Sequence, residues 1–539
     1  MAPSNHAGVH LACTASPTPH HGCEETAQRD VDPAQCILPE KVSQLQITPD
    51  RVISPNTLPP ELLQLIFEHT IDTVDTAPEA NARLVEITHV CRYWRDVALH
   101  TPTLWTHIAV SNLDAVKTFL KRSQDLPLHS FIHTTPEALA NPKHVFNQVF
   151  QAYLTQYGRT YHFKASVTQS HAFDFVMRRI ASTRAPLLEK VDIERLPPRE
   201  TFNIPASRPA EFDGVPRLRY LKLFGEFLPW LPKGPNALTE INLDSALHDV
   251  YTLVSLLGRS PFLERVTISG WFNPRGTRDA RRVTLTRIKS LRVESYPIRG
   301  IAALLPSLIL PSQHTEIAVG TRDRPWPYSW RGDNDSFSDL VPAREWADPL
   351  RWAALEGLRR IELSSSYRDN MLRAYRTGDA DDGAAATLQV STHHWRTTDE
   401  RFFVRWPFDA SLVETVTIDG WFTIRGRERW SEMFAAVPVL QTLRVKGINT
   451  EMLDGLILGL APDRLDPVCT QLQTLVLQDI TLEKPAWKAL MDVVASRSPG
   501  AGGCLSHVEL SLKGPAVWGQ STSRRIGEAG VELVLSASV

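Results

Sequence analysis

A short pattern of apolar and polar positions recurs through most of the chain. Each copy has an apolar residue, two mostly polar residues, a second apolar residue, one polar residue and a third apolar residue. The last two apolar residues share one face of a strand, because they lie two apart, and the first packs in the turn before it. The pattern predicts strands at Leu188/Val191/Ile193, Leu218/Leu221/Leu223, Leu238/Ile241/Leu243, Leu263/Val266/Ile268, Ile288/Leu291/Val293, Leu358/Ile361/Leu363, Val413/Val416/Ile418, Leu440/Leu443/Val445, Leu472/Leu475/Leu477 and Leu505/Val508/Leu510.

Helical patterns lie in several of the intervals. Apolar residues at three- and four-residue steps predict helices around residues 113–120, 145–157, 173–180, 247–257, 452–460 and 487–494, and Asn112 suits the N-cap of the first. Strand followed by helix predicts units that stack into one continuous curved sheet, with the central and final residue of each triplet buried. The pattern resembles the L-x-x-L-x-L core of a leucine-rich repeat.

The array departs from a regular repeat. Most triplets start 20 to 33 residues after the previous one, but two steps take 70 and 55 residues, and the Asn or Cys expected after each strand is mostly missing. We therefore expect a degenerate array, with loop insertions near 320–345 and 377–400. A generic α/β domain is the alternative.

Two helices are predicted ahead of the array. Pro59 and Pro60 suit the opening of the first helix, and Glu61 places an acid in its first turn. The apolar residues that follow cover more than one side of this helix, so part of its surface needs a partner or a neighbour: Leu62, Leu63, Leu65, Ile66 and Phe67. The second helix is predicted from Leu84, Ile87, Val90, Cys91, Trp94 and Val97, ending at Thr101-Pro102, with Leu104 and Trp105 folding back as a cap.

The strings LPPELLQLIF and VCRYWRDVALHTPTLW carry a family resemblance. Together they resemble an F-box, especially its fungal form, over about a tenth of the chain. The departure is the link from Ile71 to Ala80, which is longer and more acidic than in a minimal F-box. The resemblance implies that the apolar helix edges dock the Skp adaptor, and through it a cullin, of a ubiquitin ligase. A helical hairpin that merely caps the array is the alternative.

The resemblance also implies which residues bind the adaptor. They are Leu58, Pro59, Leu62, Ile66, Phe67, Val90, Cys91, Trp94 and Trp105. The predicted architecture is α/β, with a small N-terminal helical F-box followed by a leucine-rich-repeat-like solenoid of alternating strands and helices. The expected divisions are a disordered leader at 1–50, the F-box at 51–110 and the array at 111–539.

Composition and missing motifs argue against several classes of function. The net charge of −2 gives no global attraction to nucleic acid or to an anionic membrane, and the six cysteines form no CxxC pair that would indicate a zinc site. No signal peptide and no apolar run of membrane-spanning length is present, so we expect a cytoplasmic or nuclear protein. No nucleotide-binding, metalloprotease or serine-hydrolase string occurs, so we expect no catalytic residue, cofactor or metal.

One longer segment is nearly duplicated. Residues 264–276 read ERVTISGWFNPRG and residues 414–426 read ETVTIDGWFTIRG, with nine of thirteen positions identical. We expect matching strand-turn corners, with Trp271 and Trp421 buried and Arg275 and Arg425 at the surface; a paired docking surface is the alternative.

These observations predict a substrate-recognition subunit of a Skp/cullin/F-box ubiquitin ligase. In this prediction the chain is a non-catalytic adaptor, and its repeat array binds a protein substrate whose identity the sequence does not give. The alternatives are a protein-interaction scaffold that uses the F-box-like hairpin outside a ligase, and a hydrolase hidden in the array, which the missing motifs disfavour.

Overall fold

The structure is a computed structural model that describes residues 55–538 except for several internal segments. The chain divides into two compact units, Met1–Leu58 and Pro59–Val539. The predicted leader at 1–50 lies outside the described residues. The internal positions that are not described are 75, 135–144, 168–175, 177, 181, 196–213, 225–236, 274–281, 296–300, 302–303, 321–351, 366–368, 377–385, 394–407, 421–423, 425, 462–467 and 514–526.

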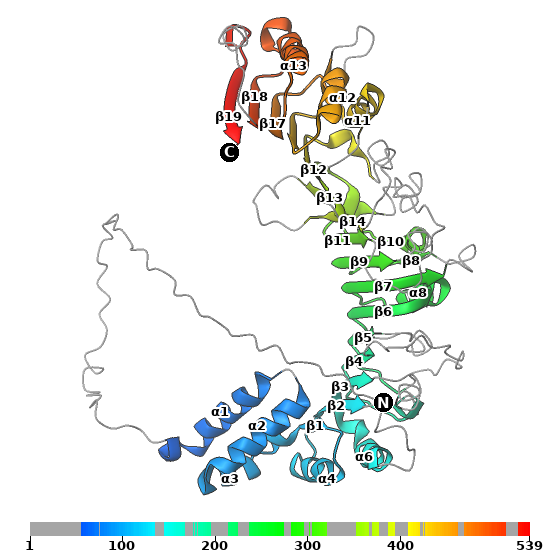
Figure 1. Ribbon diagram of the computed structural model, residues 1–539. Coiled ribbons are helices and arrows are strands. Elements are labelled where there is room, and N and C mark those ends of the chain that lie inside the picture. Colours follow the sequence, from blue (N-terminus) through cyan, green and yellow to red (C-terminus); the bar gives the residue numbers. More distant parts are fainter. Residues whose placement is uncertain are drawn as a thin grey trace, which may run out of the picture. The chain divides into compact units, whose positions relative to one another are not determined.

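The larger unit opens with helices and then enters a sheet (Figure 1). The first elements are α1 (Pro60–Asp72), α2 (Ala77–Val90), α3 (Arg92–Leu99), the 3-10 turn η2 (Pro102–Trp105) and strand β1 (His107–Ala109), and the short turn η1 (Pro55–Thr57) precedes them. The first predicted helix and the predicted cap at Leu104 and Trp105 are therefore present.

The second predicted helix is wrong in one respect, because Cys91 divides it into α2 and α3. The Cys91 backbone is extended, with φ −156° and ψ 174°, and its Sγ accepts a hydrogen bond from the Trp94 N–H at 3.4 Å. Cys91 therefore ends one helix and caps the next. The link between α1 and α2 is also shorter than expected, because α2 begins at Ala77 and the Thr76 hydroxyl caps it.

Among the described residues, seventeen strands form one sheet. Its order follows the chain from β1 to β7, continues through β9 and β11, reverses through β14, β13 and β12, and resumes from β15 to β19. Neighbouring strands are parallel except where β13 is involved. The fold is thus a mixed α/β chain in which a helical region leads into a large sheet.

The strands after β1 are β2 (Leu128–Thr134), β3 (Thr160–Val167), β4 (Lys190–Arg195), β5 (Tyr220–Phe224), β6 (Glu240–Asp249), β7 (Arg265–Asn273), β9 (Ser290–Ser295), β11 (Glu316–Gly320), β12 (Leu358–Ser365), β13 (Asp369–Arg376), β14 (Leu388–His393), β15 (Thr415–Gly420), β16 (Thr442–Lys446), β17 (Thr474–Ile480), β18 (His507–Lys513) and β19 (Glu532–Ser538). A separate parallel pair joins β8 (Val283–Thr284) and β10 (Leu308–Ile309).

All ten predicted triplets contribute strands to this one sheet. The central and final apolar residues of every triplet are at most 3% exposed. Equivalent residues are also register partners, as where Ile241 of β6 pairs with Leu221 of β5 and Val266 of β7. The prediction of one continuous sheet with buried triplets is therefore confirmed, and each inward row is a continuous apolar ladder.

Strands that the sequence pattern did not predict lie in the two long gaps between triplets. Ile317 of β11 pairs with Leu291 of β9 on one side and Leu388 of β14 on the other. Antiparallel β13 then connects β14 to β12, so the parallel order resumes at β15. Leu388–His393 is therefore a strand, although it falls within the loop insertion expected near 377–400, and most of the expected insertion at 320–345 lies outside the described residues.

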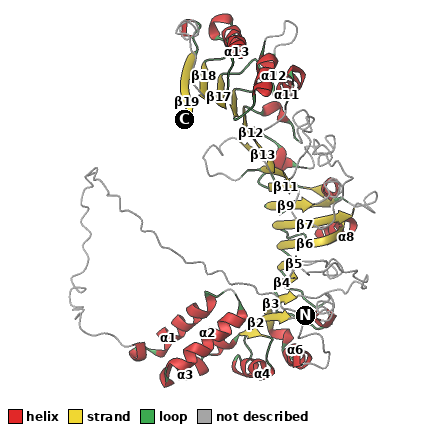
Figure 2. Cartoon of the chain, viewed as in Figure 1, coloured by secondary structure: helices red, strands yellow, loops and turns green. Residues whose placement is uncertain are grey.

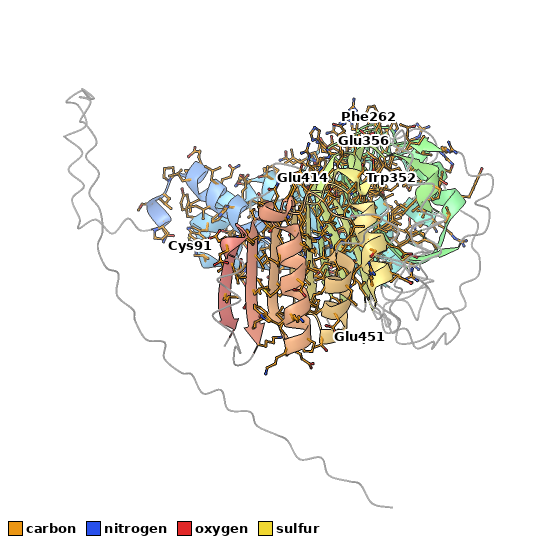
Figure 3. All side chains as sticks on the ribbon, turned by 90° about the horizontal axis from the view of Figure 1, so that it is seen from above. Cys91, Phe262, Trp352, Glu356, Glu414 and Glu451 are labelled. Atoms are coloured by element: carbon orange, nitrogen blue, oxygen red, sulfur yellow. The ribbon has the colours of Figure 1, made fainter. Side chains whose placement is uncertain are left out.

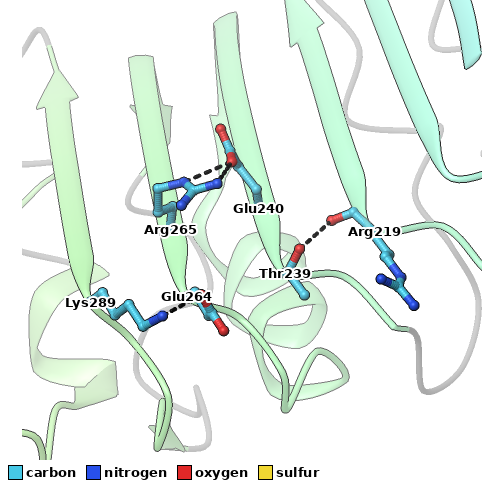
Figure 4. Close-up of polar contacts among 6 residues, drawn as sticks. All are labelled: Arg219, Thr239, Glu240, Glu264, Arg265 and Lys289. Carbon is cyan, nitrogen blue, oxygen red and sulfur yellow. Dashed lines mark hydrogen bonds and ion pairs between the residues drawn. The ribbon is translucent and has the colours of Figure 1, made fainter. Parts of the chain in front are cut away.

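The starts of successive strands are joined by backbone carbonyls that each accept two N–H groups. The Glu264 carbonyl accepts from Lys289 at 2.7 Å and Ser290 at 3.1 Å, and the same arrangement recurs at Glu189, Arg219, Thr239, Glu414, Gln441 and Gln473. Side chains pair along this edge too, with Lys289 Nζ 2.7 Å from Glu264 Oε2 (Figure 4). Exposed ion pairs contribute little stability, so we assign them mainly to fixing the register.

Because most strands are parallel, their starts lie along one side of the sheet and their ends along the other. Phe262, Glu356 and Glu414 lie shortly before β7, β12 and β15, and they are found along one side in Figure 3. Glu451, in the helix α12 (Thr450–Leu460) that follows β16, lies on the opposite side. Side chains at strand starts are thus separated from those at strand ends.

Helices connect many of the strands. They are α4 (Leu113–Arg122), α6 (Val145–Leu154), α8 (Val250–Gly258), α11 (Arg427–Ala436), α12 (Thr450–Leu460) and α13 (Lys484–Arg497). Asn112 caps α4 as predicted, α11 was not predicted, and the helix expected at 173–180 falls largely outside the described residues. Figure 2 shows α12 and α13 beside β17 and β18. Arg497 of α13 joins these layers by donating to the carbonyls of Leu460 at 2.7 Å and Val468 at 2.8 Å.

A left-handed residue follows four of the triplets by two positions. It is Gly270 (φ 137°), Gly420 (φ 102°), Gly447 (φ 69°) and Asp479 (φ 55°). The first two belong to the near-duplicated segments, where the strand was predicted to end at the glycine. Strand β15 does end at Gly420, but β7 continues through Gly270 to Asn273, so the prediction is confirmed for the second copy and wrong for the first. The side chains of Trp271, Trp421, Arg275 and Arg425 lie outside the described residues.

Replacing Gly420 by Ala should destabilise the protein more than replacing Gly447. Either change puts a Cβ at positive φ, which costs roughly 1 to 2 kcal/mol. A Cβ on Gly420 would also lie 1.9 Å from the Ser365 carbonyl oxygen, whereas on Gly447 nothing lies within 3.7 Å. We expect Gly420→Ala to lower the urea midpoint clearly further; equal midpoints would contradict this account.

Three histidines line the exposed face of the first strands. His107, His129 and His162 are register partners on β1, β2 and β3. The His107 and His129 ring centroids are 4.8 Å apart, and those of His129 and His162 are 5.9 Å apart. Burial, and to a smaller degree the nearby His107, His162 and Lys190, lower the pKa of His129 to about 4. Burial also lowers the pKa values of His107 and His162.

Acid should therefore weaken the fold through this row. The pKa of His129 is about 4 in the folded protein and about 6.5 in the unfolded chain. The free energy of unfolding therefore does not depend on His129 above about pH 6.5, and it decreases as the pH falls toward 4, because only the unfolded chain takes up the proton. Between pH 7.5 and 5 the loss should be about 2 kcal/mol in the free energy of unfolding. Urea unfolding at both pH values should show a smaller acid loss for His129→Gln than for the parent, and identical losses would show that His129 is not responsible.

Candidate functional site

Helix α1 presents apolar residues on two opposite sides. Leu63, Phe67 and Ile71, spaced four apart, face the core and are at most 2% exposed. On the other side, Leu62, Leu65 and Ile66 are 47%, 61% and 46% exposed. The expectation of excess apolar surface on this helix is therefore met, and its outer row is a candidate contact surface for another protein.

Aromatic packing holds α1 against α3 and η2. The Phe67 and Trp94 ring centroids are 5.0 Å apart. The buried Trp105 indole N–H donates to the Ala98 carbonyl at 2.8 Å, and the Arg122 guanidinium lies 4.2 Å from the centre of its ring. These contacts fix the direction in which the outer row of α1 points.

A polar bridge supplements this packing. The Glu68 carboxylate accepts a hydrogen bond from the Thr103 hydroxyl at 2.6 Å and another from the Gln64 side-chain amide at 3.0 Å. Thr103 belongs to η2, so the bridge connects the end of the helical region to α1 across 35 residues of sequence. The bridge and the aromatic cluster make the helices one packed unit.

The structure separates the nine predicted adaptor-binding residues into three groups. Pro59, Leu62, Ile66 and Val90 are exposed, whereas Leu58, Cys91 and Trp94 are partly buried. Phe67 and Trp105 are only 1% and 3% exposed. These two side chains therefore have a packing role that supports the surface, and their direct contact with an adaptor stays a prediction.

Two exposed apolar residues were missing from the predicted set. Leu65 is 61% exposed beside Leu62 and Ile66, and Val85 of α2 is 48% exposed. The sequence did hold a signal for Leu65, because a helical wheel places it opposite Leu63 and Phe67. Val85 lies away from the buried row formed by Ala80, Leu84 and Ile87.

Two other kinds of feature are absent from the described residues. Within those residues, no cluster of three or more His, Cys, Asp or Glu side chains has the geometry of a metal site. Among the described helices, none combines the length and apolar character needed to cross a membrane.

Comparison with known proteins agrees with the helical architecture. The F-box-like family model matches residues 55–111, which contain α1 to α3, η2 and β1. No curated protein matches the chain. F-box domains generally belong to non-catalytic adaptors and mediate protein-protein interaction, typically with Skp-type adaptors. The match over residues 55–111, together with the exposed apolar row of α1, supports the chain as an F-box protein.

Proposed function

We propose that this protein is the substrate-recognition subunit of a Skp/cullin/F-box ubiquitin ligase. In this function the F-box-like helices bind a Skp adaptor, and the remainder of the chain binds a protein target. Ubiquitin transfer belongs to other subunits, so the protein needs no catalytic residue of its own. A cytoplasmic or nuclear location accompanies this proposal.

The observation that carries the proposal is the exposed apolar row on α1 within the F-box-like match. Leu62, Leu65 and Ile66 keep about half of their surface in solvent although they are large and apolar. Interfaces concentrate binding energy in such residues once a partner covers them. Because their inner neighbours already fill the helical core, the outer row is free to bind without unfolding the domain.

We further infer that residues 111–539 form a leucine-rich-repeat-like array after an F-box domain at 51–110. Support comes from the ten buried triplets, their parallel register and the helices between strands. The wide exposed face of such a sheet suits a protein target better than a small molecule, because protein interfaces need about 800 Å² on each partner.

Alanine at both Leu62 and Ile66 should weaken adaptor binding by at least about thirtyfold. Removing a side chain that is desolvated at the centre of an interface costs about 2 kcal/mol. Both side chains lie outside the helical core, so the melting temperature should change little. Binding of a purified Skp-type adaptor to the full chain, measured by calorimetry, gives the two dissociation constants to compare.

Leu458→Ala is the matched control, because Leu458 of α12 is 50% exposed and lies outside the F-box-like match. It should leave adaptor affinity unchanged. Unaltered affinity in the Leu62→Ala/Ile66→Ala variant would contradict the proposed surface. Recovery of the adaptor without a cullin from cells would instead favour the scaffold function.

A further inference from the structure

The exposed face of the sheet carries an unusual group of side chains at its first strands. The histidine row of β1 to β3 is continued by Lys190, the register partner of His162 on β4. Tyr161 adds an aromatic ring 5.5 Å from that of His129. Lys164 of β3 lies two residues beyond His162 on the same face. We call His107, His129, His162, Lys164 and Lys190 the histidine-lysine patch.

The polar atoms of this patch lack partners. Within the part of the chain that the structure describes, no ring nitrogen of the three histidines makes a hydrogen bond, and neither lysine makes an ion pair. The His107 Nδ1 atom is buried without a partner. An unpaired buried polar atom is costly, so His107 Nδ1 marks the point where a ligand would complete the patch. The other four side chains are half-buried or exposed and are therefore open to a partner.

Farther along the sheet, many charged side chains on the same face are already paired. Lys222 is 3.4 Å from Asp192, Arg265 binds Glu240, and Arg292 binds Glu294. Acidic groups do stand near the histidines, since Asp72 raises the pKa of His107 and Asp192 raises that of His162, but burial outweighs both. Asp192, the register partner of Lys164, lies 3.4 Å from Lys222 Nζ through its Oδ1 atom, but this atom makes no hydrogen bond, so an acidic ligand has to avoid it.

We propose that the histidine-lysine patch binds an acidic protein segment, rich in Asp and Glu. This deepens the proposed function, on which it rests, by giving the chemical class of the target. Carboxylates accept hydrogen bonds from imidazole N–H groups and from lysine, so such a segment supplies what the five side chains lack. The patch lies beside the F-box-like helices, because β1 belongs to both regions.

A nucleic acid fits the patch less well than an acidic peptide. Binding to a phosphate backbone depends on neutralising several phosphates with Lys or Arg. The patch offers two lysines, and its histidines are uncharged at neutral pH because their pKa values are lowered. Neutral imidazoles can still donate hydrogen bonds to carboxylates.

Binding of an acidic segment should be linked to proton uptake. A carboxylate beside His129 favours the charged imidazole and raises its pKa. If the bound pKa approaches the ordinary value of about 6.5, affinity should increase about fourfold between pH 7.5 and 6. The free protein loses stability over part of the same range, so the two effects have opposite signs and can be told apart.

The experiment uses fluorescence anisotropy of the full chain with a labelled peptide of alternating Glu and Ser. A second peptide with Gln in place of Glu is the neutral probe. We expect the acidic peptide to bind more tightly, more so at pH 6, and His129→Gln/Lys190→Gln to weaken binding by at least about tenfold. Lys446→Gln is the matched control, because Lys446 is an exposed lysine on β16, away from the patch. This change should alter binding less than about twofold.

The controls also separate this inference from adaptor binding. His129→Gln/Lys190→Gln should keep its affinity for the Skp-type adaptor, whereas Leu62→Ala/Ile66→Ala should lose the adaptor and keep the acidic peptide. Equal binding of the Glu and Gln peptides, or unchanged binding by the patch variant, would overturn the inference. Tighter binding of a single-stranded oligonucleotide than of the acidic peptide would overturn it in favour of a nucleic-acid surface.

Discussion

The pairing of β1 with β2 is the constraint on which the arrangement depends. β1 follows the F-box-like helices directly, yet its three residues pair in register with β2 of the large sheet. The other edge of β1 faces Asn81 of α2. When the Asn81 amide is turned so that both of its ends are satisfied, its N–H donates to the His107 carbonyl at 2.6 Å and its oxygen accepts from the Ala109 N–H at 3.3 Å. One side chain thereby closes the sheet edge and attaches it to the helices, so a partner held by α1 is positioned relative to the first strands.

Beyond that junction, the sheet continues because each strand offers the same apolar rows to the next. The rows pass unbroken through the strands that lack the triplet pattern, as Val293, Val319 and Val390 are successive partners on β9, β11 and β14. An antiparallel strand can enter without disturbing them, because alternate residues face the same side whichever way a strand runs. Leu372 of β13 accordingly lies between Val390 and Leu363.

The sequence predicted those features whose cause is local or periodic. Each triplet is a local period, and the Asn112 cap is a short-range hydrogen bond, so both were found. The break at Cys91 was missed because Cys91 falls on the apolar stripe of a helix, and only its extended backbone reveals the cap. Strands β13 and β14 were missed because their pairing is decided by long-range register. For the candidate site, periodicity identified the apolar residues of α1. It did not show which of them are buried, because Ile66 and Phe67 are both large and apolar, and only the packing against α3 leaves Ile66 exposed and Phe67 buried.

The outer row of α1 and the histidine-lysine patch, which lie on either side of the β1–β2 pairing, differ in the kind of group that they expose. On α1, unpartnered surface is apolar, and burying it against an adaptor releases water without any change in protonation. On β1 to β4, the unpartnered groups are imidazoles and lysines, and an approaching anion would raise the lowered pKa of His129. Asn81 and the β1–β2 pairing lie at the junction of these two surfaces. In the proposed function, adaptor binding at α1 would therefore be independent of pH, whereas binding of an acidic target at the histidine-lysine patch would vary with pH.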